Sequence, residues 1–188
     1  MRLFVGVTLE EELRVQAAIV ARELQRQLDP RIRVAWIPFE KMHFTVRFIG
    51  HVDDARATAI LEALRPPLPI APFDIVLGNC GAFPRNGSPR VVWVGLTEGV
   101  AGLRAMHEEF NRRLNPLGLT PEDREFNAHL TLGRVKDVPR DAVRAAREML
   151  AALHVGPARG RIDHATLFES RLSPRGSTYL RLLDVPLL

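Results

Sequence analysis

The sequence predicts an α+β protein built from two pseudo-symmetric lobes. Strand-like and helix-like hydrophobic patterns alternate along the 188 residues, and each half carries one His-x-Thr segment inside an apolar strand pattern. The two segments begin at His43 and His129, 86 residues apart, and no low-complexity linker separates them. We therefore expect a single domain over residues 1–188 in which each lobe supplies one His-x-Thr strand. The repetition indicates a diverged internal duplication.

The first half opens with a β-rich apolar segment. A helical pattern follows, which Thr8 can cap and which stops at Asp29-Pro30. Gly50 ends the strand that carries the first motif, and a proline pair closes the next helix. Strands are thus predicted over residues 3–9, 32–37 and 42–49, and helices over residues 10–28 and 53–64.

The second half repeats the order of strand, helix, His-x-Thr strand and helix. Asn86-Gly87 is a turn signal between two strand patterns, which predicts a long hairpin. Strands are predicted over residues 73–77, 91–96 and 127–135, helices over 99–114 and 140–153, and a closing hairpin over 159–172 and 178–187.

The charge balance favours an anionic partner without identifying it. The net charge is +4 at pH 7, and 24 of the 26 basic residues are arginines, because Lys41 and Lys136 are the only lysines. Arginine is the better bidentate donor to phosphate, but solvated basic faces and Arg-rich compositions are common.

Cysteine content and hydropathy predict the compartment. Cys80 is the only cysteine, which excludes a disulfide framework and a cysteine-based metal cluster and fits a reducing environment. The opening apolar run is shorter than that of a signal peptide, and no segment approaches transmembrane length. We expect a cytoplasmic protein with no membrane partner. We also expect a monomer, because no coiled-coil pattern or apolar helix face stands out.

The paired motifs carry the functional argument. Side chains alternate between the two faces of a strand, so His43 and Thr45 share one face while Phe44 and Val46 share the other. The second motif repeats this arrangement with His129, Leu130, Thr131 and Leu132. Each segment therefore presents an imidazole and a hydroxyl on one side of a sheet and apolar anchors on the other.

This pair of segments suits the opening of a cyclic phosphodiester. That reaction needs a base to activate water and an acid to protonate the departing oxygen, and histidine serves both roles near neutral pH. Threonine hydroxyls can donate to the non-bridging oxygens. Two lobes facing each other would place acid and base on opposite sides of phosphorus, with no metal or cofactor. A lone His-x-Thr would be a weak indication, because single strand histidines are more often structural.

With these motifs the chain resembles the two-histidine (2H) phosphoesterase superfamily. Within it, the chain is similar to the bacterial and archaeal RNA 2',3'-cyclic phosphodiesterases, also called 2'-5' RNA ligases. The similarity covers nearly the whole chain. Besides the two motifs it includes Arg2-Leu3-Phe4-Val5, Trp36, Arg47-Phe48-Ile49-Gly50, Phe83-Pro84, Val91-Val92-Trp93-Val94-Gly95, Gly133-Arg134, Ser170-Arg171-Leu172, Gly176 and Tyr179.

The resemblance implies mainly antiparallel sheets around a central cleft and hydrolysis of RNA 2',3'-cyclic phosphate ends to 2'-phosphates. It also implies a reverse, ATP-independent joining to a 2'-5' linkage. By this analogy His43 is the general acid facing the 3'-oxygen, His129 is the general base, and Arg134 contacts the phosphate with Thr45 and Thr131. The residues alone do not say which histidine is the acid.

Two positions depart from the family pattern. The family usually has proline before the second histidine, where this chain has Ala128, and it tends to have lysine at the position of Arg47. The first change loosens the entry to the strand, and the second keeps the positive charge.

Strand parity predicts which of the additional candidate residues can face the site. Counted from His129, Arg134 falls on the wrong face unless a bulge intervenes, which Gly133 makes plausible. Arg47 shares parity with His43, so it either faces the cleft as a substrate contact or lies on its rim. Parity with the buried motif residues predicts Phe48 in the core.

The remaining candidates have less specific interpretations. Trp36, Phe48 and Phe83 are aromatic residues that could stack on a nucleobase. The unpaired histidines are interpreted as surface or structural residues, and Cys80 as a buried apolar residue. These histidines are His51, His107, His154 and His164.

Three functions remain open at this point. The first is processing of RNA ends. The second is a phosphodiesterase for a small cyclic nucleotide or a 2'-5' oligonucleotide. The third is a non-catalytic RNA-binding module, against which the intact histidines and threonines count.

Overall fold

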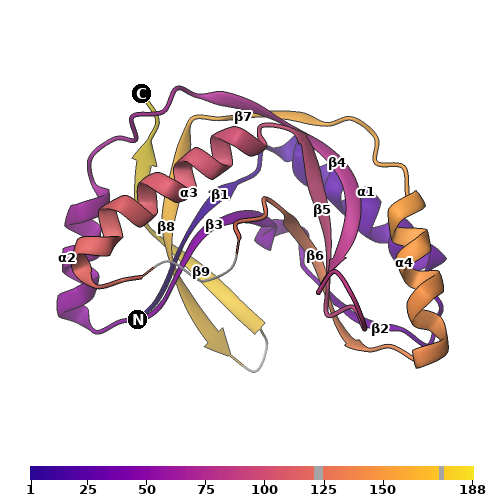
Figure 1. The fold of residues 1–188 in the computed structure, drawn as a ribbon. Helices are drawn as coiled ribbons and strands as arrows, with labels where there is room; N and C mark the ends of the chain where they lie inside the picture. Colours follow the sequence, from indigo (N-terminus) through magenta and orange to yellow (C-terminus); the bar gives the residue numbers. More distant parts are fainter. Residues whose placement is uncertain (121–124, 174–175) are drawn as a thin grey trace.

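The computed structural model describes residues 1–120, 125–173 and 176–188, and its helices lie on the outer side of a curved β-sheet (Figure 1). The strands are β1 Arg2–Thr8, β2 Arg33–Trp36, β3 His43–His51, β4 Phe73–Phe83, β5 Val91–Glu98, β6 Leu130–Asp137, β7 Arg159–Ile162, β8 His164–Ser173 and β9 Gly176–Pro186. The α-helices are α1 Glu11–Gln27, α2 Asp54–Leu64, α3 Val100–Leu114 and α4 Val143–Ala152.

One sheet runs through the molecule in the order β7-β4-β5-β6-β3-β1-β8-β9, with β2 paired to β6 beside this path. The pairings between these strands are antiparallel. The two motif strands, β3 and β6, are neighbours at the centre of the sheet and meet where Phe44 lies opposite Leu130. The sheet thus brings the two motifs together although they are far apart in sequence. The predicted α+β class with mainly antiparallel strands is confirmed.

Two of the helices link the two halves of the chain, because each packs against strands of the other half. α1, from the first half, packs against β6 and β7, whereas α3, from the second half, packs against β3. α4 covers β4, and α2 packs against α3 (Figure 1). Within the described residues, no helix is long and apolar enough to cross a membrane.

The core lies between these helices and the convex face of the sheet, and it contains the predicted apolar anchors of both motifs. Phe44, Val46, Leu130 and Leu132 are all buried. Leu103, Met106 and Phe110 bury one side of α3 at helical spacing. The motif strands are therefore fixed from behind by packed apolar side chains, which leaves their other face to the site.

Most element boundaries agree with the sequence within a few residues, and three differ. β4 continues to Phe83, well beyond the predicted end at residue 77, because it pairs with β5 along the whole hairpin. The segment predicted as one strand over 159–172 is split at Asp163 into β7 and β8, which join opposite ends of the sheet. Thr8 does not cap α1; Glu10 holds that position without a side-chain hydrogen bond.

Candidate active site

Both motif histidines are fixed by a backbone carbonyl two residues before them. His43 Nδ1 lies 2.8 Å from the Lys41 carbonyl oxygen, and His129 Nδ1 lies 2.7 Å from the Asn127 carbonyl oxygen. Because a carbonyl oxygen only accepts, each Nδ1 carries the hydrogen. Each Nε2 is therefore the nitrogen that can take up or release a proton in the reaction.

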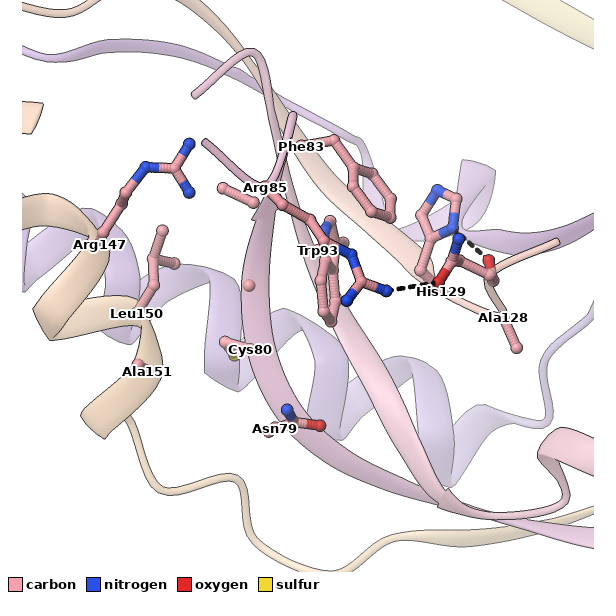
Figure 2. Close-up of a pocket in the computed structure, with 13 residues that line it drawn as sticks. Asn79, Cys80, Phe83, Arg85, Trp93, Ala128, His129, Arg147, Leu150 and Ala151 are labelled. Atoms are coloured by element: carbon pink, nitrogen blue, oxygen red, sulfur yellow. Dashed lines mark hydrogen bonds between the residues drawn. The ribbon is translucent and has the colours of Figure 1, made fainter. Parts of the chain in front are cut away.

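Aromatic side chains hold the two imidazoles in their orientations. The His43 ring lies 4.9 Å from the ring of Phe4 and 5.1 Å, edge-on, from that of Tyr179. His129 meets Phe83 edge-on, with 4.9 Å between the ring centroids (Figure 2). Each histidine thus has its own aromatic neighbours, supplied by different strands.

A glycine leaves space for the first of these rings. Gly6 in β1 lies opposite Thr45, and a Cβ there would be 3.0 Å from the Phe44 carbonyl oxygen and 3.3 Å from His43 Cδ2. A larger residue would press on the His43 ring and disturb the hydrogen bond that fixes it.

Burial lowers the pKa of both histidines below the ordinary value. For His43 the hydrogen bond to the Lys41 carbonyl opposes this shift, and the positive charge of His129 adds to it. For His129 the hydrogen bond to the Asn127 carbonyl opposes the shift, and the charge of Arg134 adds to it. The charge of Arg134 thus favours the neutral form of His129, and the charge of His129 favours the neutral form of His43.

In each motif strand, the residue three positions after the histidine forms a β-bulge, because the pairing with the neighbouring strand skips it. The pairing of β3 with β1 skips Val46, and the pairing of β6 with β5 skips Leu132. A bulge interrupts the alternation of side chains along a strand. The residues after Val46 and Leu132 therefore lie on the faces opposite to those that simple parity predicts.

The bulge in β6 brings Arg134 to the site. Arg134 is exposed and lines a cavity of about 160 Å³, here called the central cavity, together with Thr131. The irregularity that Gly133 suggested is present one residue earlier, at Leu132. The remaining residues lining the central cavity are Arg2, Phe4, Ile37, Lys41, His43, Thr45, Phe48, Ser170, Ser177 and Tyr179.

The bulge in β3 turns Arg47 away from the site. The expectation that Arg47 lies in the cleft or on its rim is wrong, because this residue is only 4% exposed. Its guanidinium donates to the carbonyl oxygens of Phe48 at 2.7 Å and Thr120 at 2.6 Å. Arg47 thus has a structural role behind the sheet.

The same bulge exposes Phe48, so its predicted place in the core is also wrong. Phe48 is 37% exposed, lines the central cavity, and has the Arg2 guanidinium 5.1 Å above its ring. Trp36 packs against the core instead. Phe48 and Arg134, each five residues after its histidine, are equivalent positions of the two motifs.

His129 borders a second, larger cavity of about 390 Å³, here called the β4 cavity (Figure 2). It is formed by residues 79–83 of β4, Arg85, Trp93, residues 127–129, and the α4 residues Arg147, Leu150 and Ala151. No sequence pattern indicated this cavity, because its walls come from four separate segments.

The other singled-out residues have structural surroundings. His107 is half-buried and bonded to the Val46 carbonyl oxygen, in keeping with a structural histidine. His51 and His154 are exposed, and His164 is half-buried beside Asp163. Cys80 is buried, which raises the pKa of its thiol to about 12. In the described part of the chain, no three His, Cys, Asp or Glu side chains are grouped as metal ligands.

Comparison with protein families finds the same repetition as the sequence. Residues 9–93 and residues 94–179 each match the model of the LigT-like phosphoesterase family, one match for each His-x-Thr motif. This result supports an internal duplication and covers most of the chain.

Individual relatives agree. An RNA 2',3'-cyclic phosphodiesterase of Aeropyrum pernix is 38% identical over 149 residues, which are 78% of this chain and 82% of that protein. A protein of the same name from Thermotoga maritima is 29% identical over 98% of this chain and 94% of its own length.

Solved structures share the fold. The crystal structure of TT0787 from Thermus thermophilus superposes with a TM-score of 0.77 at 25% identity, covering 100% of this chain and 98% of that one. Apo LigT of Escherichia coli gives a TM-score of 0.72 at 23% identity over 99% and 96% of the two chains. Together with the two family matches and the Aeropyrum relative, this places the chain in the LigT-like phosphoesterase family.

Proposed function

We propose that this protein hydrolyses RNA 2',3'-cyclic phosphate ends to 2'-phosphates, with His43 as general acid and His129 as general base. The observation that carries the proposal is the matched pair of histidines, each fixed through Nδ1. His43 lies on β3 with Thr45, His129 immediately precedes β6, which carries Thr131, and the charge of Arg134 acts on His129. The names of the Aeropyrum and Thermotoga relatives support the substrate.

The phosphate would lie between Thr45, Thr131 and Arg134. The threonine hydroxyls donate to the non-bridging oxygens, and the Arg134 guanidinium offsets the charge that develops on them in the transition state. His129 Nε2 removes a proton from water, which attacks phosphorus in line with the bond to the 3'-oxygen. That bond breaks, and His43 Nε2 protonates the departing 3'-oxygen, so the phosphate stays on the 2'-oxygen.

This scheme uses groups that the chain itself supplies. A base, an acid, two hydroxyl donors and a guanidinium cation cover each requirement of the reaction, so we propose that it proceeds without a metal ion. The net charge of +4 and the three cationic side chains that line the central cavity, Arg2, Lys41 and Arg134, suit an RNA end. We further propose that the protein acts as a monomer in the cytoplasm, which the buried free thiol of Cys80 fits.

Joining to a 2'-5' linkage, which we propose as a second activity, uses the same groups. When the 5'-hydroxyl of a second RNA replaces water, His129 deprotonates it and His43 protonates the 3'-oxygen. The product is a 2'-5' phosphodiester, and no ATP is consumed because the cyclic phosphate supplies the leaving group.

The test is to incubate the protein with an RNA ending in a 2',3'-cyclic phosphate in the presence of EDTA and to identify the product end. We expect a 2'-phosphate. We also expect His43→Ala and His129→Ala each to abolish turnover. A 3'-phosphate, dependence on added metal, or near-normal activity of either variant would contradict the proposal.

A further inference from the structure

The β4 cavity lies on the His129 side of the site, apart from the central cavity. Its lining includes His129 but not His43, whereas the lining of the central cavity includes His43 but not His129. The two motif histidines therefore open onto different cavities. In an in-line displacement at phosphorus, the groups on the entering and leaving oxygens lie on opposite sides, so each cavity corresponds to one of these groups.

Hydrolysis leaves the larger cavity without an occupant. Under the proposed function the ribose with the cyclic phosphate lies on the His43 side, and His129 handles only a water molecule. The β4 cavity measures about 390 Å³, which is in the range of small-molecule binding sites and far larger than a water needs.

The walls of the β4 cavity suit a nucleoside. Trp93 and Phe83 supply aromatic surface beside His129, with their rings 5.2 Å apart (Figure 2). The Trp93 indole lies over Gly81, where a Cβ would come within 2.4 Å of the ring. The cavity thus offers aromatic surface on which a base can stack.

The outer wall of the β4 cavity carries positive charge. Arg85 donates to the Asn127 side-chain oxygen at 3.1 Å, and Arg147 donates to the carbonyl oxygens of Pro84 and Gly87 at 2.7 and 2.6 Å. These acceptors are neutral, and in the described part of the chain neither guanidinium forms an ion pair with a carboxylate. Both charges remain available to a phosphate that follows the nucleoside.

We propose that the β4 cavity binds the nucleoside that carries the 5'-oxygen of a 2'-5' phosphodiester. This inference rests on the proposed function and assigns the second RNA to the β4 cavity. In the cleavage direction His43 Nε2 takes the proton of the 3'-hydroxyl, whose oxygen forms a bond to phosphorus. The bond from phosphorus to the 5'-oxygen breaks, and His129 Nε2 protonates that oxygen. The products are a 2',3'-cyclic phosphate and a free 5'-hydroxyl, so atoms and charges balance without a co-reactant.

The first experiment compares two substrates that differ only in the second nucleoside. Adenosine 2',3'-cyclic phosphate fills the central cavity alone, and 2'-5'-linked diadenosine monophosphate needs both cavities. We expect the wild-type protein to cleave the dinucleotide to the cyclic phosphate and adenosine. A 3'-phosphate on the second nucleoside should lower KM, because it reaches Arg85 and Arg147.

The second experiment fills the β4 cavity from α4. Ala151→Trp places an indole in the cavity at an exposed helix position away from His129, and Ala152→Trp makes the same change at the next position, outside the cavity. We expect Ala151→Trp to lower kcat/KM for the dinucleotide, relative to that for the cyclic mononucleotide, by about tenfold or more. Ala152→Trp should leave this ratio unchanged.

A charge change tests the same cavity independently of its volume. Arg85→Glu should remove the advantage of the 3'-phosphorylated dinucleotide, whereas Arg90→Glu, in the same hairpin but outside the cavity, should keep it. If the wild-type protein hydrolyses the cyclic mononucleotide but not the dinucleotide, or if Ala151→Trp and Ala152→Trp give the same ratio, the assignment of the cavity is wrong and the proposed function stands. If the cyclic mononucleotide is not hydrolysed, the proposed function itself fails.

Discussion

His107 Nδ1 donates a hydrogen bond to the carbonyl oxygen of Val46, over 2.7 Å. Val46 is the bulged residue of β3, so its carbonyl lies where the ladder to β1 is interrupted. His107 Nε2 lies 2.9 Å from the Asn111 side-chain nitrogen, and Phe126 stacks on the imidazole at 4.5 Å. One histidine thus joins the bulge after the first motif to the segment that leads into the second.

We predict that His107 positions the site without touching the substrate. His107→Leu removes the donor to Val46 and leaves a half-buried carbonyl unsatisfied, at a cost of about 1–3 kcal/mol in the free energy of unfolding. Because Thr45 immediately precedes the bulged residue, a shift of Val46 should displace the Thr45 hydroxyl, and kcat should fall about tenfold while KM changes little. Thermal unfolding and steady-state kinetics on a cyclic phosphate measure the two effects.

His107→Asn is the matched control, because the Asn side-chain nitrogen can take the place of Nδ1 as donor. It should recover most of kcat. If both variants lose the same stability and neither loses activity well below the unfolding temperature, the hydrogen bond serves the fold alone.

The pH of maximal hydrolysis should lie below the ordinary histidine pKa. Hydrolysis needs one protonated and one neutral histidine, and burial lowers the pKa of both His43 and His129. The protonated form of the acid is therefore lost as pH rises through values below the ordinary histidine pKa of about 6.5. We expect a bell-shaped profile of kcat/KM with its maximum below about pH 6.5, whose limbs belong to the coupled pair. A bound phosphate anion favours imidazolium, so the kcat profile should lie at higher pH. A kcat/KM maximum clearly above pH 7 would contradict this account.

Removing the charge of Arg134 should change both the rate and the pH profile. Arg134→Gln deletes a cation from the phosphate site, and we expect kcat/KM to fall by about 100- to 1000-fold. Since the charge of Arg134 lowers the pKa of His129, the acid limb of the profile should move to higher pH in this variant. Lys136→Gln, exposed on the same strand, is the control and should change neither. A rate loss without a shifted limb would mean that Arg134 does not interact with His129.

Strand parity predicted the faces of the side chains only as far as the two bulged residues. Up to Val46 and Leu132 the alternation of side chains correctly placed the apolar anchors in the core, and His43, Thr45 and Thr131 line one cavity. Beyond those residues it placed Arg47 and Phe48 on the wrong faces. A bulge depends on how two strands pair, and a single sequence does not contain that information. Gly133 indicated an irregularity near Arg134, but nothing comparable follows His43.

The exposed Phe48 leads to a prediction that separates recognition from folding. Phe48→Ala should weaken binding of the terminal nucleobase and raise KM about tenfold, because a stacked base contributes about 1–3 kcal/mol. Its effect on the free energy of unfolding should stay within about 0.5 kcal/mol, since the ring is partly exposed. Phe44→Ala, four residues earlier and 1% exposed, should instead cost about 3–5 kcal/mol.

A substrate without a base makes this test specific. With a ribose 2',3'-cyclic phosphate that lacks the nucleobase, wild type and Phe48→Ala should have the same KM, because the ring then has no partner. Arg134→Gln should remain impaired on that substrate, since its contact is with the phosphate. Equal losses for Phe48→Ala on both substrates would mean that Phe48 acts by holding Arg2, whose guanidinium lies 5.1 Å above its ring, and not by stacking on the base. Phe48 and Arg134, the equivalent positions of the two motifs, would then both support binding of the phosphate, instead of one binding the base and the other the phosphate.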